Sequence, residues 1–403
     1  MADVTNYIDR LVAELCPDGV EYRPLESLGK RNKGTAITAS KMRSLEPGNK
    51  DLRIFAAGST FVDTDSSNIP AKDILHGPAI IVKSRGYIGF EYYEESFTHK
   101  NEMWSYTLDS KIVDQKFIYY YLLTQAYYLQ ELARSKSVKL PQLAVKDTDS
   151  LEVPVPPLEI QEAIVEILDK FTNLEAELEA ELEARTLQYE YYRDSLFEAL
   201  DCPRVPLGSF ARLVRGSGMP KTDFSESGVG AIHYGQIYTK FGTATAEVIA
   251  HVPEEKAKKL AVVNPGDVIV ANTSENLEDV CKAVAWVGES DIVTGGHATV
   301  IKAPEQNAKF ISYYMATGQF NKDKRRHAFG TKVIDVAPKN LAKIEFPLPP
   351  LEEQQRIVDI LDRFDALTTS LSEGLPAELA ARRSQYEYYR DQLLTFPRKG
   401  ENQ

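Results

Sequence analysis

The residues of this sequence that could do chemistry lie in short polar clusters and not in a catalytic motif. No Asn-Pro-Pro-aromatic or Asp-Pro-Pro-aromatic loop for amino methylation occurs, no GxGxxG follows an apolar run, and no Walker A sequence is present. The six histidines show no HExxH or paired ligand spacing, and His297, after Gly295-Gly296, is expected to be a core or turn residue. The sequence therefore predicts no catalytic residue, no metal site and no cofactor for this chain.

The polar clusters suit hydrogen bonding to DNA. Arg and Lys match guanine edges, Asn and Gln match adenine edges, and phosphates attract Lys and Arg. In the first half of the chain the predicted DNA-binding residues are Lys33, Thr35, Lys83, Ser84, Arg85, Tyr87, Lys136 and Lys139. In the second half they are Arg215, Lys221, Gln236, Asn272, Ser274, Asn276, Lys324, Arg325, Arg326 and Lys332. Any single cluster could also be a solvated surface. The prediction rests on equivalent places in the two halves: turns at 83–87 and 271–276, and basic stretches at 134–139 and 324–332.

The charge distribution leaves DNA binding open. The net charge of −12 would disfavour contact with phosphates. Residues 151–200, however, hold 13 acidic and three basic residues, so most of the acidity lies in one segment. The long blocks on either side are close to neutral, and each could carry a local basic face.

The elements that must position these clusters are revealed by an internal repeat. Residues 153–174 (VPVPPLEIQEAIVEILDKFTNL) and 346–367 (FPLPPLEEQQRIVDILDRFDAL) are identical at 13 of 22 positions. Residues 184–196 (ARTLQYEYYRDSL) and 381–393 (ARRSQYEYYRDQL) are identical at ten of 13. A fragment of the same unit lies at residues 5–16, where Asp9, Leu11 and Leu15 match Asp194, Leu196 and Leu200. This circular arrangement predicts a pseudo-two-fold molecule whose termini lie close together.

Between the repeated parts, apolar runs bounded by turn residues predict strands at 79–82, 231–234 and 267–270, and amphipathic stretches predict helices at 115–134 and 308–320. The predicted fold class is α/β: two mixed α/β domains joined by two long antiparallel coiled-coil helices. The predicted domains are an N-terminal helix completing the C-terminal repeat (1–16), a first α/β domain (17–152), a central helical spacer (153–200), a second α/β domain (201–345) and a C-terminal helical spacer (346–403).

The first spacer is a candidate ruler. After Pro156-Pro157, apolar residues recur at steps of four and three, which is the period of a coiled coil. Its centre repeats Leu-Glu-Ala-Glu from Leu174 and again from Leu178. One such tetrapeptide adds about 6 Å to a helix. The second copy contains Gly374 and Pro376, which predict a kink or break near 372–377.

These features together resemble the specificity subunits of type I restriction–modification systems. The resemblance rests on PLPPLEEQQRIVDILD, its second copy VPPLEIQEAIVEILDKF, the duplicated QYEYYRD and the Leu-Glu-Ala-Glu tandem, and it covers essentially the whole chain. It implies that each α/β domain binds one half of a split, asymmetric site in double-stranded DNA. It also implies that the helices hold the halves apart and dock two adenine-N6 methyltransferase subunits, to which restriction/motor subunits are added. S-adenosylmethionine, ATP and Mg would be bound by those partners.

Two other functions were weighed. A scaffold that binds only proteins through the same two domains is not separated from a DNA reader by the residues alone. A self-contained modification enzyme is disfavoured by the missing motifs. The N-terminus has no signal-peptide pattern and the three cysteines form no paired spacing, so a cytoplasmic protein with reduced thiols is expected.

Overall fold

The computed structural model describes residues 2–45, 50–137, 139–368 and 374–400. Its contacts divide the chain into two compact units: unit 1 is Met1–Ala176 with Ala381–Gln403, and unit 2 is Glu177–Ala380. Each unit is therefore one α/β block together with parts of both helical segments. The division falls within both helical segments, after Ala176 in the first and after Ala380 in the second.

Unit 1 contains two four-stranded sheets. The first has the order β2-β9-β6-β7 and the second β4-β3-β8-β5, with β3 and β8 parallel. The strands are β2 (Gly29–Lys33), β3 (Leu52–Phe55), β4 (Phe61–Thr64), β5 (Leu75–His76), β6 (Ala79–Lys83), β7 (Gly89–Tyr93), β8 (Ser96–His99) and β9 (Trp104–Leu108). The helices are α1 (Ala2–Leu15), α2 (Ala39–Arg43), α3 (Gln115–Lys136) and α4 (Val145–Asp149), and β1 (Tyr22–Pro24) pairs with β10 (Glu152–Pro154).

Unit 2 repeats the strand order of unit 1 although its sequence differs, and it adds one strand, β14, at the edge of the first sheet. Its sheets are β12-β21-β17-β19-β14 and β15-β13-β20-β16, and β13 and β20 are again parallel. The strands are β12 (Arg212–Arg215), β13 (Val229–Ile232), β14 (Ala244–Thr245), β15 (Ala250–Val252), β16 (Ala261–Val263), β17 (Val268–Ala271), β18 (Thr273–Ser274), β19 (Ala283–Trp286), β20 (Ile292–Thr294), β21 (Ala298–Lys302) and β22 (Ile334–Asp335), with β11 (Arg204–Pro206) paired to β23 (Glu345–Pro347). The short helices are α6 (Leu207–Phe210), α7 (Tyr234–Thr239), α8 (Glu254–Ala257) and α11 (Pro338–Leu341). Two mixed α/β units are thus confirmed.

The predicted elements are confirmed with two local differences. The strand expected at 231–234 ends at Ile232, because His233 caps α7 by accepting a hydrogen bond from the Gly235 backbone. The single helix expected at 308–320 is two helices, α9 (Ala308–Met315) and α10 (Gly318–Arg325). Thr317 starts the second one, since its side chain accepts a hydrogen bond from the Phe320 backbone.

The repeated sequence signature fastens a long helix to each block. In unit 1, Gln161 of α5 (Leu158–Glu198) accepts a hydrogen bond from the Asp114 backbone at 2.7 Å. In unit 2, Gln354 of α12 (Leu351–Thr368) accepts one from the Asn307 backbone at 3.0 Å. Both glutamines are fully buried. The position is therefore repeated because a buried amide must find partners at the start of α3 or α9.

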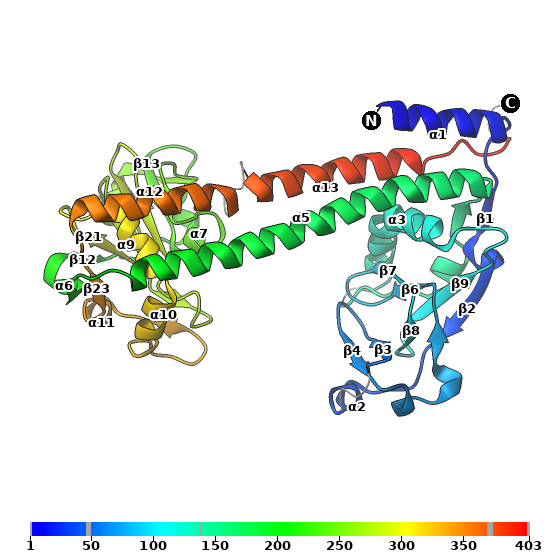
Figure 1. Cartoon of the computed structure of the whole chain (residues 1–403), viewed down its shortest axis with the longest axis horizontal. Helices are drawn as coiled ribbons and strands as arrows, with labels where there is room; N and C mark the ends of the chain where they lie inside the picture. Colours follow the sequence, from blue (N-terminus) through cyan, green and yellow to red (C-terminus); the bar gives the residue numbers. More distant parts are fainter. Residues whose placement is uncertain (1, 46–49, 138, 369–373, 401–403) are drawn as a thin grey trace. The chain divides into compact units, whose positions relative to one another are not determined.

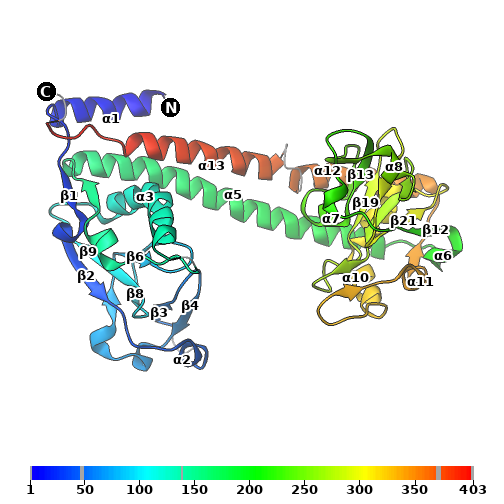
Figure 2. The same cartoon turned by 180° about the vertical axis from the view of Figure 1, so that it is seen from behind.

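A second repeated contact lies a little over two turns further along each helix. In unit 1, Asp169 of α5 accepts a hydrogen bond from the Tyr120 hydroxyl at 2.5 Å and pairs with the Lys116 ammonium at 2.8 Å. In unit 2, Asp362 of α12 accepts one from Tyr313 at 2.7 Å and pairs with Lys309 at 2.7 Å. Figures 1 and 2 both show α3 beside the N-terminal part of α5, and the equal contacts give α9 the same place beside α12.

Helix α5 is continuous over 41 residues. Its first turns are buried at Ile160, Ile164 and Leu168, whereas the leucines of the Leu-Glu-Ala-Glu tandem are only half-buried. Towards its end the helix is buried again, at Tyr189 and Phe197. The second helical segment is described as α12 and α13 (Gly374–Leu393). Of the kink or break predicted near 372–377, residues 372 and 373 lie outside the described residues, whereas 374–377 are described and form the start of α13.

Long-range helix contacts occur inside each unit. In unit 1 the rings of Phe171 in α5 and Tyr389 in α13 stack at 5.7 Å between centroids. In unit 2 the rings of Tyr192 in α5 and Phe364 in α12 stack at 5.8 Å. Each half of α5 therefore packs against a segment of the second copy.

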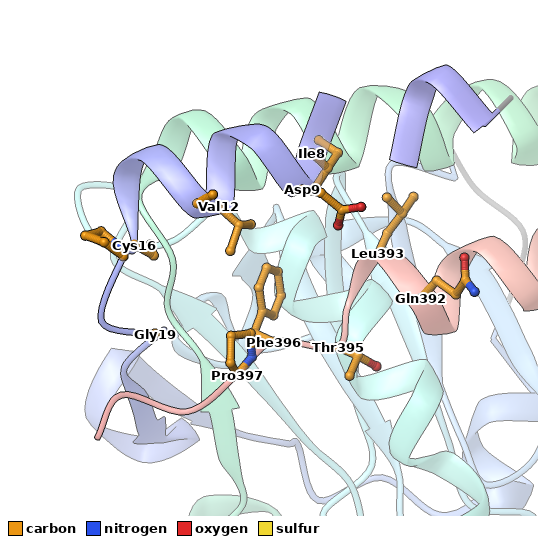
Figure 3. A pocket seen from close by; sticks show the side chains of 12 residues that line it. Ile8, Asp9, Val12, Cys16, Gly19, Gln392, Leu393, Thr395, Phe396 and Pro397 are labelled. Carbon is orange, nitrogen blue, oxygen red and sulfur yellow. The ribbon is translucent and has the colours of Figure 1, made fainter. Parts of the chain in front are cut away.

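The two ends of the described chain meet in unit 1. The backbone N–H of Val20 donates to Pro397 at 2.8 Å, and that of Lys399 donates to Val20 at 3.0 Å. Figure 3 shows α1 lying over the end of α13, with Ile8 and Val12 facing Leu393 and Phe396 across a pocket of about 380 Å³. The expected closeness of the chain ends is thus observed for these residues.

No helix among the described residues has the length and apolar character to cross a membrane. Within the same residues, no group of three or more His, Cys, Asp or Glu side chains could hold a metal ion.

Candidate nucleic-acid interface

The predicted polar turns occupy the same place in both units. Ser84 follows β6 and Asn272 follows β17, and these strands hold the same position in their sheets. The Ser84 carbonyl accepts a hydrogen bond from the Leu143 backbone at 2.9 Å, and the Asn272 carbonyl accepts one from Val336 at 3.0 Å. The chain therefore returns from the helices to the same turn in each unit.

The expectation of an exposed side chain is wrong for Thr35, Ser84, Asn272 and Lys324, which are all buried. The Thr35 hydroxyl donates to Asp73 at 2.9 Å, and the Ser84 hydroxyl donates to the Glu102 carbonyl. These groups hold loops together, because a buried hydroxyl without a partner would destabilise the fold.

The same correction in unit 2 has a similar cause. The Asn272 amide donates to the Val336 carbonyl at 2.7 Å and accepts from the Thr299 hydroxyl at 2.6 Å. The Lys324 ammonium donates to the carbonyls of Glu278 and Val280, each at 2.7 Å. Burial lowers the pKa of Lys324. All four side chains therefore act inside the protein, where they fix the loops that carry their exposed neighbours.

Several predicted cations have acidic partners within the protein. Lys83 pairs with Glu91 at 2.6 Å, Lys136 pairs with Asp147, and Arg215 approaches Asp335 at 3.5 Å. At the C-terminal end of α10, Arg325 approaches Glu278 and Arg326, the capping residue, approaches Asp323, each at 3.3 Å. The exposed pairs among these, such as Arg325–Glu278, contribute little to stability.

The remaining predicted residues present their side chains at the surface or near it. Tyr87 is 76% exposed. Arg85 is exposed and donates to Gln142 at 3.0 Å. Lys33, Lys139, Lys221, Asn276 and Lys332 are exposed, and Ser274 and Gln236 are half-buried. The oxygen of the Gln236 side chain accepts the His233 backbone N–H at 2.8 Å, and its amide nitrogen has no hydrogen-bond partner among the described residues.

The sequence did not single out an aromatic cluster at the ends of the unit 2 strands. The Tyr234 ring lies 4.4 Å from the His233 ring and 5.1 Å from the His297 ring, between centroids. Burial lowers the pKa of His233, and the nearby charges of Lys221 and His297 lower it further. His233 is buried, whereas His297 is exposed and lies in the turn between β20 and β21, so of its two expected places the turn is confirmed and the core is not. The one available signal was a histidine directly after two glycines.

Each unit thus presents cations, amides and aromatic side chains on turns at strand ends. This composition suits a duplex, because cations meet phosphates while amides, hydroxyls and rings meet base edges.

Comparison with known proteins finds a DNA specificity domain over most of the chain. The type I restriction modification DNA specificity domain matches residues 17–184 and, a second time, residues 204–381. A type I restriction enzyme specificity subunit of Escherichia coli is 36% identical over 254 residues, which are 60% of this chain and 60% of that protein. A type I restriction enzyme specificity subunit of Haemophilus influenzae is 29% identical over 295 residues, covering 70% of this chain and 73% of its own length.

Solved structures share the fold at low sequence identity. The crystal structure of a type I restriction-modification S subunit from M. genitalium aligns with a TM-score of 0.55 at 16% identity, over 93% of this chain and 96% of that one. A chain from a study of complex assembly in a type I system aligns with a TM-score of 0.56 at 15% identity, over 93% and 97%.

Proposed function

Because the chain belongs to the type I restriction-modification DNA specificity family, we propose that each of its units binds one half of a bipartite, asymmetric DNA site. The observation that carries the proposal is one strand order built twice from diverged sequences. Equal scaffolds place turns equally, while unlike turn residues select unlike bases. Arg85 and Tyr87 follow β6 in one unit, and Ser274 and Asn276 follow β17 in the other.

We further propose that the paired helices set the distance between the half-sites. Helix α5 starts in unit 1 and ends in unit 2 without a break. At about 1.5 Å per residue, its 41 residues span roughly 60 Å. The stacked pairs Phe171–Tyr389 and Tyr192–Phe364 support an antiparallel coiled coil with pseudo-two-fold symmetry.

The duplicated QYEYYRD element supports the docking of two copies of one partner. Tyr191 in unit 2 is 70% exposed, and its counterpart Tyr388 in unit 1 is 59% exposed. Both lie in the same local sequence, beside Glu190 and Glu387 respectively. Exposed aromatic side chains are common anchors of protein interfaces. Two equal patches suit two methyltransferase subunits, to which restriction/motor subunits are added.

On this proposal the chain is not an enzyme. Methyl transfer, ATP hydrolysis and cleavage belong to the partners, which bind S-adenosylmethionine, ATP and Mg. The complex of this chain with its partners acts on cellular DNA, in the cytoplasm.

A binding experiment tests the proposal. The chain is purified together with its methyltransferase, and mobility shifts are measured with genomic fragments in the presence of excess nonspecific DNA. We expect retention of a subset of fragments that share a split motif. Equal retention of all fragments, or of none, would support a protein-binding scaffold instead. Methyl transfer by the chain without its partner would show an enzyme.

A further inference from the structure

The turn between β20 and β21 holds a residue in an unfavourable backbone conformation. His297 has a φ of +66°, in the left-handed region that residues other than glycine seldom adopt, although histidine adopts it more often than most. Gly296 directly precedes it, so the chain has glycine beside the strained position but not at it. The side chain is exposed, so the strain is not explained by packing in the core.

The backbone around His297 is fixed on both sides. Its carbonyl accepts a hydrogen bond from the Asn272 backbone at 2.7 Å, and the next carbonyl, of Ala298, accepts one from Gly216 at 2.9 Å. A Cβ atom on Gly295 would lie 2.2 Å from the Cβ of Met219, and one on Gly216 would lie 1.9 Å from the Gly295 carbonyl oxygen. The turn at 216–219 and the turn at 295–297 are therefore closely packed, and neither can shift relative to the other without a clash.

The imidazole is positioned beside polar and aromatic residues. The Tyr234 ring lies 5.1 Å from it at an interplanar angle of 51°. Tyr234 is itself held by His233, whose ring is 4.4 Å away and whose backbone is capped by Gln236. The exposed cation of Lys221 lies close enough to His233 to lower its pKa.

Unit 1 differs at the same place. There the parallel bridge between Thr35 and Lys100 corresponds to the bridge between Ser217 and Gly295 in unit 2. Lys100 pairs with Glu102 at 2.6 Å. The described non-glycine residues with positive φ are Lys50, Cys281 and His297, so the turn at 99–104 has none. The strained residue is thus specific to one of two units that share a strand order.

We propose that His297, supported by Tyr234, contacts a base edge in the half-site bound by unit 2. Strained residues persist where function requires a side chain at an exact place, since a glycine would relieve the strain. An imidazole can donate to or accept from a base edge, and a fixed ring selects among bases better than a mobile lysine does. The inference rests on the proposed function and names a specificity-determining residue within it.

The test compares stability with sequence selectivity. The variant H297G is produced in a host together with the methyltransferase, and adenine methylation across the genome is compared with that of the wild type. We expect the motif to become degenerate at one position of one half-site, while the other half-site and the spacer are retained. The melting temperature should be unchanged or higher, because glycine accepts the left-handed conformation.

Two further variants keep the outcome interpretable. H251A replaces another histidine of unit 2, which lies in β15 opposite Gly230, and should leave the motif unchanged. Y234L should relax the same motif position as H297G, and the double variant should be no more degenerate than H297G alone, because the two rings act as one unit.

An unchanged motif with H297G would overturn this inference and leave the proposed function standing. So would a uniform loss of methylation at every target, which indicates a phosphate contact or a structural role, or a lowered melting temperature with an unaltered motif. A wild-type complex that gives no bipartite motif would overturn the proposed function, and this inference with it.

Discussion

Shortening α5 by one tetrapeptide should shorten the DNA spacer. Deletion of residues 178–181 (Leu-Glu-Ala-Glu) removes about 6 Å of helix, at about 1.5 Å per residue. At about 3.4 Å per base pair, this equals roughly two base pairs. Four residues turn a helix by about 40° beyond one full turn, so the apolar stripe stays near its original face. Leu178 is only half-buried, and the three residues after it are exposed, so the deletion opens no cavity in either core.

The deletion is assayed by sequencing adenine methylation in a host that carries the variant with its methyltransferase. We expect both half-sites to keep their bases and the spacer to lose about two base pairs. Duplication of the same tetrapeptide should add a similar length. The variant E179Q/E181Q keeps the length of α5 and should keep the spacer. Altered half-site bases with an unchanged spacer would refute the idea that α5 is a ruler.

Three other perturbations give separate results. Y191A and Y388A should each weaken binding of the methyltransferase at the altered patch by about 2 kcal/mol, or roughly 30-fold, so that one copy is bound and not two. Y127A alters a tyrosine that is 78% exposed outside the repeat, and it should leave two copies bound. Native mass spectrometry measures the number of copies, and equal stoichiometry in all three variants would contradict the prediction. His99 is buried and burial lowers its pKa to about 4, so the unfolded chain takes up a proton below pH 6.5 that the folded chain refuses. Unit 1 should therefore lose up to about 3 kcal/mol of stability as the pH falls from 6.5 to 4. Hydrogen exchange of residues 96–108 would detect this loss, and amide protection that does not change with pH would contradict it. If Lys332 contacts a phosphate, K332Q should lower the slope of log affinity against log salt by about one without changing the motif; an altered motif would instead make it a base contact.

The sequence predicted the helical elements well because their repeated residues are contact residues. Gln161 and Gln354 recur since each fastens a helix to the start of its neighbour, and Asp169 and Asp362 recur since each binds a tyrosine and a lysine. Such contacts depend on a fixed spacing along the chain, which a sequence displays directly.

The shared strand order of the two blocks was not visible in the sequence. It depends on pairings between distant segments, such as β3 with β8 and β13 with β20, and many unrelated residues satisfy such pairings equally. Strand positions could therefore be predicted from local patterns, whereas the strand order could not.

The candidate site was predicted in part. The turns after β6 and β17 were placed correctly, but the burial of Asn272 and Lys324 depends on partners far along the chain, Val336 and Glu278. The backbone strain at His297 has no sign in composition or periodicity. A sequence can thus show which side chains could read DNA, while the structure decides which of them face outwards.

The most direct test of two reading units on one ruler is the methylation pattern of the wild-type complex. A host without other adenine methylation receives this chain and its methyltransferase, and its genome is sequenced with detection of N6-methyladenine. The account predicts one motif made of two unlike half-sites separated by a spacer of constant length and unspecified bases. A continuous motif, a motif with two identical halves, or a spacer of variable length would contradict it.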